Sequence, residues 1–313
     1  MARYHIETYG CTSNRGESQA IERRLRAGGH HPVDGPAAAD VAILNTCTVV
    51  ETTEHNMLRR ARELDEETPA DLVVTGCMAL AQGEAFSDAG IDATILHWEE
   101  VPEYVRNGEC PTVTPDVEPV LDGVVGILPI ARGCMSDCSY CITKAATGKI
   151  DSPPVEENVE KARALVHAGA KELRITGQDT GVYGWDDGER KLHVLLDRIC
   201  TEIAGDFRVR VGMANPKGVH GIREELAAVF AEHDELYNFL HAPVQSGSDD
   251  VLGDMRRQHQ VSEYVEVVET FDDALEEWTL STDFIVGFPT ETDADFEQTM
   301  ALLRETRPEK INV

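Results

Sequence analysis

A short apolar run precedes each of three cysteines in the first eighty residues of the chain. The runs RYHIETYGC, VAILNTC and LVVTGC end at Cys11, Cys47 and Cys77. Their length and their Gly or Asn neighbours predict buried strands, and the stretches between them, residues 18–26 and 51–64, have the pattern of helices. Consecutive parallel strands end at one edge of a sheet, so we expect the three thiols to converge there. The alternative is three unrelated buried thiols, which are common in protein cores.

The alternation of strands and helices resumes after a break. The first set ends with a short strand near residues 93–96, and residues 109–122 (ECPTVTPDVEPVLD) lack hydrophobic periodicity, which predicts a linker. Six further strands alternating with helices predict an α/β chain whose second part is a parallel barrel or a portion of one. The predicted strands cover residues 127–131, 172–176, 208–212, 238–241, 280–286 and 310–313. The predicted helices cover residues 155–167, 192–203, 222–232, 262–275 and 292–305.

Three more cysteines, Cys134, Cys138 and Cys141, share one short predicted loop, RGCMSDCSYC. Closely spaced thiolates suit soft metals and iron–sulfur clusters. A zinc site normally has a fourth ligand, and the nearest downstream candidate, His167, is 26 residues past Cys141. The loop therefore favours a cluster with one iron open to a small molecule.

Polar and glycine-rich turns follow several of the predicted barrel strands. Residues 177–179 (GQD), 245–247 (QSG) and 287–289 (GFP) all occupy such positions. Ligands of parallel barrels bind at the C-terminal ends of the strands, so these turns are candidate binding elements. Cys110 in the predicted linker and Cys200 at the end of a predicted helix are interpreted as structural.

The charge balance is strongly acidic, with 57 acidic and 28 basic residues and a net charge of −29. At low salt this excludes an ordinary polyanion-binding surface. The acidic residues are scattered and only 7 basic residues are Lys, a composition that resembles proteins of halophilic archaea. At ~1 M salt the screening length falls to ~3 Å, and nucleic acid remains a possible partner. The arginine pairs at 23–24, 59–60 and 256–257 are interpreted as solvated helix faces rather than phosphate contacts.

No run of ~18 apolar residues is present, so we expect no membrane span. The N-terminal residues MARYHIETYGC contain no long apolar stretch, which argues against a secretory signal. We therefore expect a cytoplasmic protein; the oligomeric state does not follow from the sequence.

The chain resembles radical S-adenosylmethionine methylthiotransferases, and most of all the archaeal and eukaryotic type that acts on threonylcarbamoyladenosine in tRNA. The matching segments, within residues 7–296, are ETYGCTSN, NTCTV, TGCM, RGCMSDCSYCITK, TGQDTGVYG, HAPVQSGSDDVLGDMRR and TDFIVGFPTETDADF. The resemblance implies an N-terminal open parallel α/β domain (residues 1–108), a linker (109–122) and a partial (β/α)6 radical S-adenosylmethionine barrel (123–313). The family's C-terminal RNA-binding TRAM domain is expected to be absent, with the barrel incomplete at Val313.

The resemblance also implies a reaction and its cofactors. The expected activity is that of a transferase that methylthiolates C2 of N6-threonylcarbamoyladenosine next to the anticodon of tRNA, with an external electron donor and sulfur source. The expected cofactors are S-adenosylmethionine and two [4Fe–4S] clusters. One cluster would be held by Cys134, Cys138 and Cys141, and an auxiliary one by Cys11, Cys47 and Cys77. Cofactor contacts are expected at Tyr140, Gly177, Gln178, Asp179, Gln245 and Ser246.

Two positions depart from the family pattern. Thr147 stands where many members have Arg, and Thr290 replaces Gly in GFPGET. Three other functions remain open: methylthiolation of a ribosomal protein aspartate, a non-catalytic iron–sulfur electron carrier, and an interaction module structured by zinc.

Overall fold

The computed structural model describes residues 1–48, 51–106 and 118–313. Cys110 and most of the predicted linker therefore lie outside the described residues. The chain divides into two compact units, residues 1–122 with 142–148 and residues 123–141 with 149–313. Residues 142–148, which the sequence analysis places in the barrel, belong to the first unit. No helix in the described ranges is long and apolar enough to cross a membrane.

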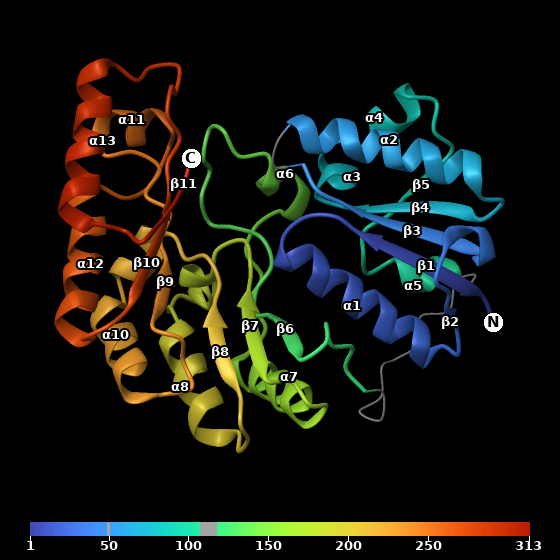
Figure 1. Ribbon diagram of the computed structural model, residues 1–313, viewed down its shortest axis with the longest axis horizontal. Coiled ribbons are helices and arrows are strands. Elements are labelled where there is room, and N and C mark those ends of the chain that lie inside the picture. The colour runs from blue at the N-terminus through green and yellow to red at the C-terminus, as the bar shows by residue number, and fades with distance from the viewer. Residues whose placement is uncertain (49–50, 107–117) are drawn as a thin grey trace. The chain divides into compact units, whose positions relative to one another are not determined.

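The first unit contains one parallel sheet in the order β2-β1-β3-β4-β5. Its strands are β1 (Arg3–Thr8), β2 (His31–Pro32), β3 (Val41–Thr46), β4 (Asp71–Gly76) and β5 (Thr94–Ile95). Its helices are α1 (Thr12–Ala27), η1 (Pro36–Ala38), α2 (Glu51–Glu67), α3 (Cys77–Gln82), α4 (Glu84–Asp88), α5 (Val101–Val105) and α6 (Thr143–Thr147). Helices α1 and α5 cover one face of the sheet, and α2, α3 and α4 cover the other (Figure 1).

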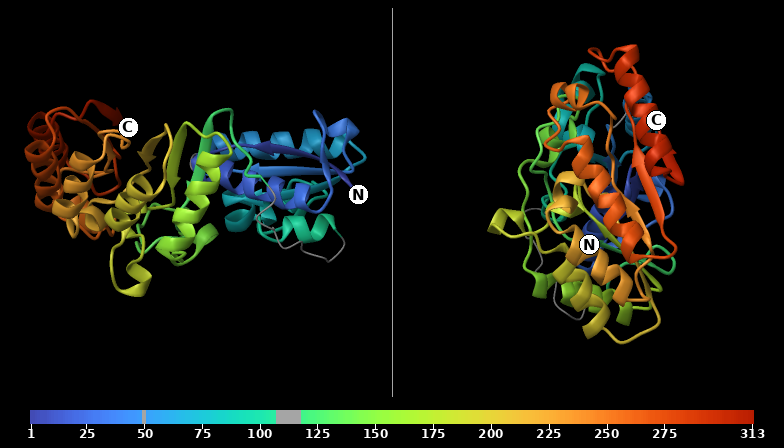
Figure 2. Two further views of the ribbon diagram at one scale, coloured as in Figure 1. Left: turned by 90° about the horizontal axis from the view of Figure 1, so that it is seen from below. Right: turned by 90° about the vertical axis from the view of Figure 1, so that its left-hand side faces the viewer.

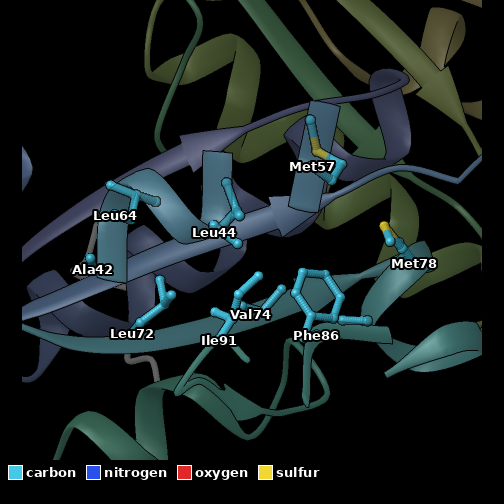
Figure 3. Packing of buried hydrophobic residues seen from close by; sticks show 11 residues of the cluster. Ala42, Leu44, Met57, Leu64, Leu72, Val74, Met78, Phe86 and Ile91 are labelled. Carbon is cyan, nitrogen blue, oxygen red and sulfur yellow. The ribbon is translucent and has the colours of Figure 1, made fainter. Parts of the chain in front are cut away.

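Side chains along the central strands alternate between two cores, because successive residues of a strand point to opposite faces. In β3, Val41 and Ile43 pack with Ile21 and Leu25 of α1. The intervening residues join the core on the other face, which Figure 3 shows. That core comprises Ala42, Leu44, Met57, Ala61, Leu64, Leu72, Val74, Met78, Ala79, Phe86 and Ile91. Burial on both faces explains why β3 and β4 are continuous apolar runs rather than alternating ones.

The second unit contains two parallel three-stranded sheets, β6-β7-β8 and β11-β10-β9. Its strands are β6 (Val125–Pro129), β7 (Glu172–Thr176), β8 (Arg208–Val211), β9 (Phe239–His241), β10 (Thr279–Asp283) and β11 (Lys310–Asn312). Its helices are α7 (Val155–His167), η2 (Thr180–Val182), η3 (Trp185–Asp187), α8 (Leu192–Glu202), α9 (Pro216–His220), α10 (Arg223–Glu232), α11 (Asp249–Asp254), α12 (Val261–Ala274) and α13 (Asp293–Thr306). Helices α7, α8, α10 and α12 are successive neighbours along the outside of the strands (Figures 1 and 2). The predicted fold, an open parallel α/β domain followed by a partial barrel, is confirmed.

The two sheets of the second unit meet at one isolated parallel bridge between Val209 and Leu236. The backbone N–H of Val209 donates to Glu235 O at 2.8 Å, and the N–H of Tyr237 donates to Val209 O at 2.9 Å. The ladder does not continue from β8 to β9, so the barrel strands form two separate sheets.

Several predicted boundaries differ from the structure: the strand predicted at residues 127–131 covers 125–129, and the helix predicted at 51–64 extends to Glu67. Two further differences have a clear physical reason. The predicted strand at residues 280–286 ends at Asp283, which pairs with Asn312, the last residue of its neighbour β11; Val286 is 48% exposed. The helix predicted from Ser18 begins six residues earlier, at Thr12. Asn14 stabilises the N-terminus of this helix, because its side-chain Oδ1 accepts a hydrogen bond from the backbone N–H of Cys11 at 3.3 Å.

A bidentate ion pair joins α2 to β1. The Arg60 guanidinium donates to both carboxylate oxygens of Glu7, at 2.6 and 2.8 Å, and the Tyr9 hydroxyl donates to the same carboxylate at 3.1 Å. The Arg60 hydrogen bonds are the largest cause holding the pKa of Glu7 below its usual value. Arg60 is therefore not the solvated residue that the sequence suggested.

We expect Arg60→Gln to lower the free energy of unfolding at pH 7 by about 1–2 kcal/mol, since a partly buried, charge-assisted pair is lost. Because the pKa of Glu7 is lower in the folded protein, the ion pair stabilises the fold fully at pH values above the unfolded pKa of about 4.3. This stabilisation is lost as the pH falls through the pKa of Glu7 in the folded protein. The deficit of the variant should therefore shrink between pH 7 and pH 3 in urea titrations. Arg59→Gln is the matched control, because Arg59 is exposed and its pair with Glu63 spans 3.7 Å. Equal effects of the two substitutions would contradict the assignment.

Candidate active site

The first three cysteines lie just beyond the C-terminal ends of adjacent strands. Cys11 is the N-cap of α1, Cys47 follows the last residue of β3, and Cys77 begins α3 directly after β4. The register pairs Thr46 with Gly76, so β3 and β4 end side by side. Cys11 is exposed, Cys47 buried and Cys77 half-buried.

Two glycines allow the chain to pass closely between these cysteines. Gly10 has φ +125°, and a Cβ there would lie 2.9 Å from Cys47 Cβ. Gly76 has φ +90°, and a Cβ there would lie 2.3 Å from Asn45 Oδ1. Neither position accepts an ordinary side chain without displacing its neighbours. The loop before Cys11 thus lies directly against Cys47.

A buried amide network supports the same strand ends. Asn14 Nδ2 donates to Asn45 Oδ1 at 3.1 Å and to Thr46 O at 3.2 Å, and Asn45 Nδ2 donates to Asn14 O at 2.8 Å and Ser18 Oγ at 3.0 Å. Both amides are at most 1% exposed. Leaving such buried groups unpaired costs about 1–3 kcal/mol each, so the network holds the cysteine-bearing loops in one arrangement. These asparagines lie within the segments TSN and NTC, but no local pattern in the sequence marks them as partners.

The thiols fit a cluster better than a single ion. Around one zinc ion, thiolates at 2.3 Å would lie about 3.8 Å apart. Among the described residues, the three thiols of the Cys11/Cys47/Cys77 set do not all lie within 4.8 Å of one another, and neither do those of the Cys134/Cys138/Cys141 set. In a cluster each thiolate binds a different iron, which suits wider spacing. Burial raises the pKa of Cys77 to about 12, with smaller contributions from Glu17 and the two other thiols, so a cation is needed to hold it as a thiolate.

The second cysteine loop, residues 134–141, follows β6 and is held by residues distant in sequence. The Gly133 N–H donates to Gln178 Oε1 at 2.7 Å. The Ser139 N–H and hydroxyl donate to the carbonyls of Met255 and Asp254, both at 3.0 Å. Within the loop, the Ser136 N–H donates to Cys134 Sγ at 3.3 Å. The loop is therefore preformed, and Gln178 acts on it as a brace.

Arg257 contacts this loop, contrary to its interpretation as part of a solvated face. Its Nη1 donates to Cys138 Sγ at 3.7 Å, and its Nη2 donates to Pro243 O at 2.6 Å. Its Nε is buried and has no hydrogen-bond partner within the described part of the chain. The adjacent Arg256 does match the prediction, because it is exposed and lies 3.8 Å from the Asp137 carboxylate. The motif HAPVQSGSDDVLGDMRR contained Arg257, but nothing local distinguished it from Arg256.

Asp179 is a buried carboxylate with one unpartnered oxygen. Its Oδ1 accepts hydrogen bonds from the N–H groups of Asn215 and Gly181, at 2.9 and 3.1 Å, whereas Oδ2 has no partner among the described residues. Burial raises the pKa of Asp179 to about 6, and the charges of Arg257 and Arg190 oppose that shift. Gly177 lies close to the start of the loop, where a Cβ would be 3.3 Å from Ala131 O. An orphaned buried acceptor beside a thiol loop fits a bound cation such as an amine.

The predicted residues Gln245 and Ser246 lie in a constrained turn. Gln245 has φ +77°, which is strained for a non-glycine residue. Its N–H donates to the carbonyl of Asp283, the last residue of β10, at 2.8 Å, and its carbonyl accepts from the Ile285 N–H at 3.0 Å. Ser246 is fully buried and its Oγ accepts from the Ser248 N–H at 3.2 Å. Tyr140 is 38% exposed at the rim of the cysteine loop.

Two family models match the chain. Residues 3–96 match the uncharacterized protein family UPF0004, and residues 128–303 match the radical SAM superfamily. Among solved structures, the radical S-adenosylmethionine methyltransferase TsrM from Kitasatospora setae has a TM-score of 0.70 at 11% identity, over 99% of this chain and 72% of that one. That likeness concerns the fold.

Curated relatives match over nearly the whole chain. A probable threonylcarbamoyladenosine tRNA methylthiotransferase of Archaeoglobus fulgidus is 37% identical, over 99% of this chain and 75% of that protein. The Methanothermobacter thermautotrophicus protein of the same name is 39% identical over 99% and 76%, and the Danio rerio threonylcarbamoyladenosine tRNA methylthiotransferase is 32% identical over 98% and 59%. With thiol loops at the strand ends of both units, the chain belongs to the threonylcarbamoyladenosine tRNA methylthiotransferase family of the radical SAM superfamily.

Proposed function

We propose that this protein methylthiolates C2 of N6-threonylcarbamoyladenosine next to the anticodon of tRNA, in the cytoplasm. The observation that carries the proposal is the 37% identity to the Archaeoglobus protein over 99% of the chain. The two sets of three cysteines at strand ends support it, because both lie in segments that the relationship covers. An electron carrier would not need the buried carboxylate of Asp179, whose Oδ2 has no partner among the described residues, or the strained Gln245 turn.

Membership of the radical SAM superfamily implies S-adenosylmethionine and one [4Fe–4S] cluster. When bound, these supply the one-electron chemistry that acid–base side chains lack at the unreactive C2–H bond of adenine. Cys134, Cys138 and Cys141 would hold the cluster. The Gly133–Gln178 hydrogen bond keeps their loop in place before loading, and Arg257 donates a hydrogen bond to Cys138 Sγ from a distant segment of the same unit.

The amino-acid end of S-adenosylmethionine carries an ammonium and a carboxylate. We place the ammonium at the unpartnered Oδ2 of Asp179. The guanidinium groups of Arg257 and Arg190 both favour the charged form of Asp179. They would also suit the carboxylate of S-adenosylmethionine. Arg190 is held in position by stacking over the Trp185 ring at 3.7 Å. Gln245 and Ser246 would contribute as part of the rigid turn, and Tyr140 as the rim of the loop.

We further propose that Cys11, Cys47 and Cys77 hold a second [4Fe–4S] cluster connected with sulfur donation. The Asn14–Asn45 network supports this role, because it fixes the three loops that carry the thiols without itself ligating metal. The reaction would also need an external electron donor and a sulfur source.

The test compares tRNA nucleosides by mass spectrometry from cells with the wild-type gene and from cells carrying Cys138→Ala. We expect the methylthio form of threonylcarbamoyladenosine to disappear in the variant while threonylcarbamoyladenosine accumulates. Cys110→Ser is the matched control, a cysteine outside both sets, and should leave the modification unchanged. If the tRNA is unaffected and a ribosomal protein loses a methylthio group instead, the substrate assignment is wrong.

We also propose that the protein functions at high internal salt, as in a halophilic archaeon. With 57 acidic and 28 basic residues, self-repulsion weakens the fold in dilute buffer and is screened at ~2 M KCl. We expect the melting temperature to rise by roughly 5 °C or more between 0.1 and 2 M KCl. Sorbitol of equal osmolality controls for excluded-solute effects. A melting temperature that is flat or falls with KCl would refute the proposal.

A further inference from the structure

A cluster of metal-ligating side chains lies outside the site described above. Ligand atoms of Cys200, His233 and Glu235 lie within 4.8 Å of one another, and those of Asp197, Glu232 and His233 do likewise. Cys200 and Asp197 lie three residues apart on α8 and therefore on one side of that helix. His233 and Glu235 follow α10, a helix that packs against α8. We call these five side chains the α8/α10 cluster.

The backbone fixes the positions of the α8/α10 cluster. The Leu236 N–H donates to His233 O at 3.1 Å, which closes a turn directly after α10. Glu235 O accepts the Val209 N–H at 2.8 Å, which ties the same turn to β8. A ring nitrogen of His233, Nε2, lies 2.9 Å from Asp197 Oδ1, and the His233 side chain is only 13% exposed. The imidazole is thus held in one orientation by an acidic partner, as in many metal sites.

The electrostatics of the α8/α10 cluster favour a cation. It brings three carboxylates around one imidazole, and no Arg or Lys of the described residues forms an ion pair with Asp197, Glu232 or Glu235. A divalent ion would compensate the carboxylates and replace the thiol proton.

We propose that Cys200, His233 and Glu235 bind a divalent metal ion of the zinc class. Thiolate, imidazole and carboxylate are ligands that Zn²⁺ takes together, and Asp197 orients the imidazole or completes the tetrahedron. Binding forms the metal–sulfur bond and releases the Cys200 thiol proton to solvent, with no change of oxidation state. This site does not depend on the tRNA reaction.

The place of the α8/α10 cluster in the fold indicates a structural role. Cys200 lies near the end of α8, before β8, and Glu235 lies just before β9. The site is therefore at the N-terminal ends of the barrel strands, whereas Cys134 follows the C-terminal end of β6. In parallel barrels the N-terminal end serves stability and the C-terminal end serves chemistry. A metal here would connect α8 to the turn where the two sheets of the unit meet at a single bridge.

The test uses anaerobically reconstituted protein with its iron–sulfur clusters loaded. ZnCl₂ is added in a chelator-buffered series, and bound zinc and iron are measured together by mass spectrometry after desalting. We expect one zinc per chain with iron unchanged, X-ray absorption showing one sulfur among nitrogen and oxygen ligands, and a zinc-dependent rise in melting temperature. Cys200→Ser and Glu235→Gln should each weaken zinc binding at least tenfold and remove that rise.

His220→Asn is the matched control. His220 also pairs with carboxylates, Glu263 and Glu266, but has Lys217 and Arg223 beside them and lies in no candidate metal group of the described residues. Its variant should bind zinc as the wild type does. No zinc binding at micromolar free zinc, or equal binding by wild type and Cys200→Ser, would overturn the proposal. Zinc uptake with matching loss of iron would likewise overturn it, since the ion would then occupy the cluster sites.

Discussion

Replacing Cys134, Cys138 and Cys141 together by Ala should abolish cleavage of S-adenosylmethionine, with 5′-deoxyadenosine falling to background. These three thiols lie on the loop after β6, and Arg257 and Gln178 hold that loop but cannot replace a thiolate. Iron in the anaerobically reconstituted protein should fall by half, from about eight to about four atoms per chain. Iron analysis and chromatography of 5′-deoxyadenosine measure both effects.

The matched variant replaces Cys11, Cys47 and Cys77 by Ala. It should lose the same amount of iron but keep S-adenosylmethionine cleavage, while formation of the methylthiolated nucleoside stops. The two variants therefore separate radical generation from sulfur transfer. Full iron content in this second variant would refute the auxiliary cluster, and loss of cleavage in it would show that the two sets of thiols do not act independently.

Asp179→Asn should weaken S-adenosylmethionine binding by about 10–100-fold without unfolding the protein. The amide oxygen can still accept from the Asn215 and Gly181 N–H groups, so the local structure survives. The change replaces the unpartnered acceptor Oδ2 with a donor and removes a charge, and a charge-assisted hydrogen bond is worth about 1.5–3 kcal/mol. Calorimetric titration of the loaded protein with S-adenosylmethionine at pH 8, above the Asp179 pKa of about 6, measures the loss.

Asp250→Asn is the control for this substitution, because Asp250 is exposed on α11 of the same unit. It should bind S-adenosylmethionine as the wild type does. Asp179→Ala provides a second comparison, since it removes both acceptors and should also lower the melting temperature. Unchanged affinity in Asp179→Asn would mean that the buried carboxylate is structural and that the ammonium binds elsewhere.

The sequence by itself determined the order of strands and helices. Apolar periodicity and cysteine spacing are local properties, and helix α7 begins and ends at the predicted residues 155 and 167. The same local logic placed Cys47 and Cys77 at the ends of neighbouring strands, because a parallel sheet with one helix per crossover leaves little freedom in where consecutive strands end. The family segments then indicated the chemistry.

Only the tertiary structure decided which side chains support that chemistry. Arg257 and Cys138 are 119 residues apart, and Asn14 and Asn45 are 31 apart. No periodicity encodes such pairs, since they depend on how loops from different strands pack at one sheet edge. The break between β8 and β9 arises in the same way, because a ladder needs two strands whose lengths and register match.

Cys200 illustrates the difference. In the sequence it ends an apolar helix pattern and looks like an ordinary core thiol. In the fold it lies half-buried beside His233 and Glu235, which come from a turn more than thirty residues later. The sequence determined that α8 and α10 exist, because their apolar faces repeat at helical spacing. The packing of those two helices alone brought thiol, imidazole and carboxylate together, because distance in space depends on how the helices cross and not on their spacing along the chain.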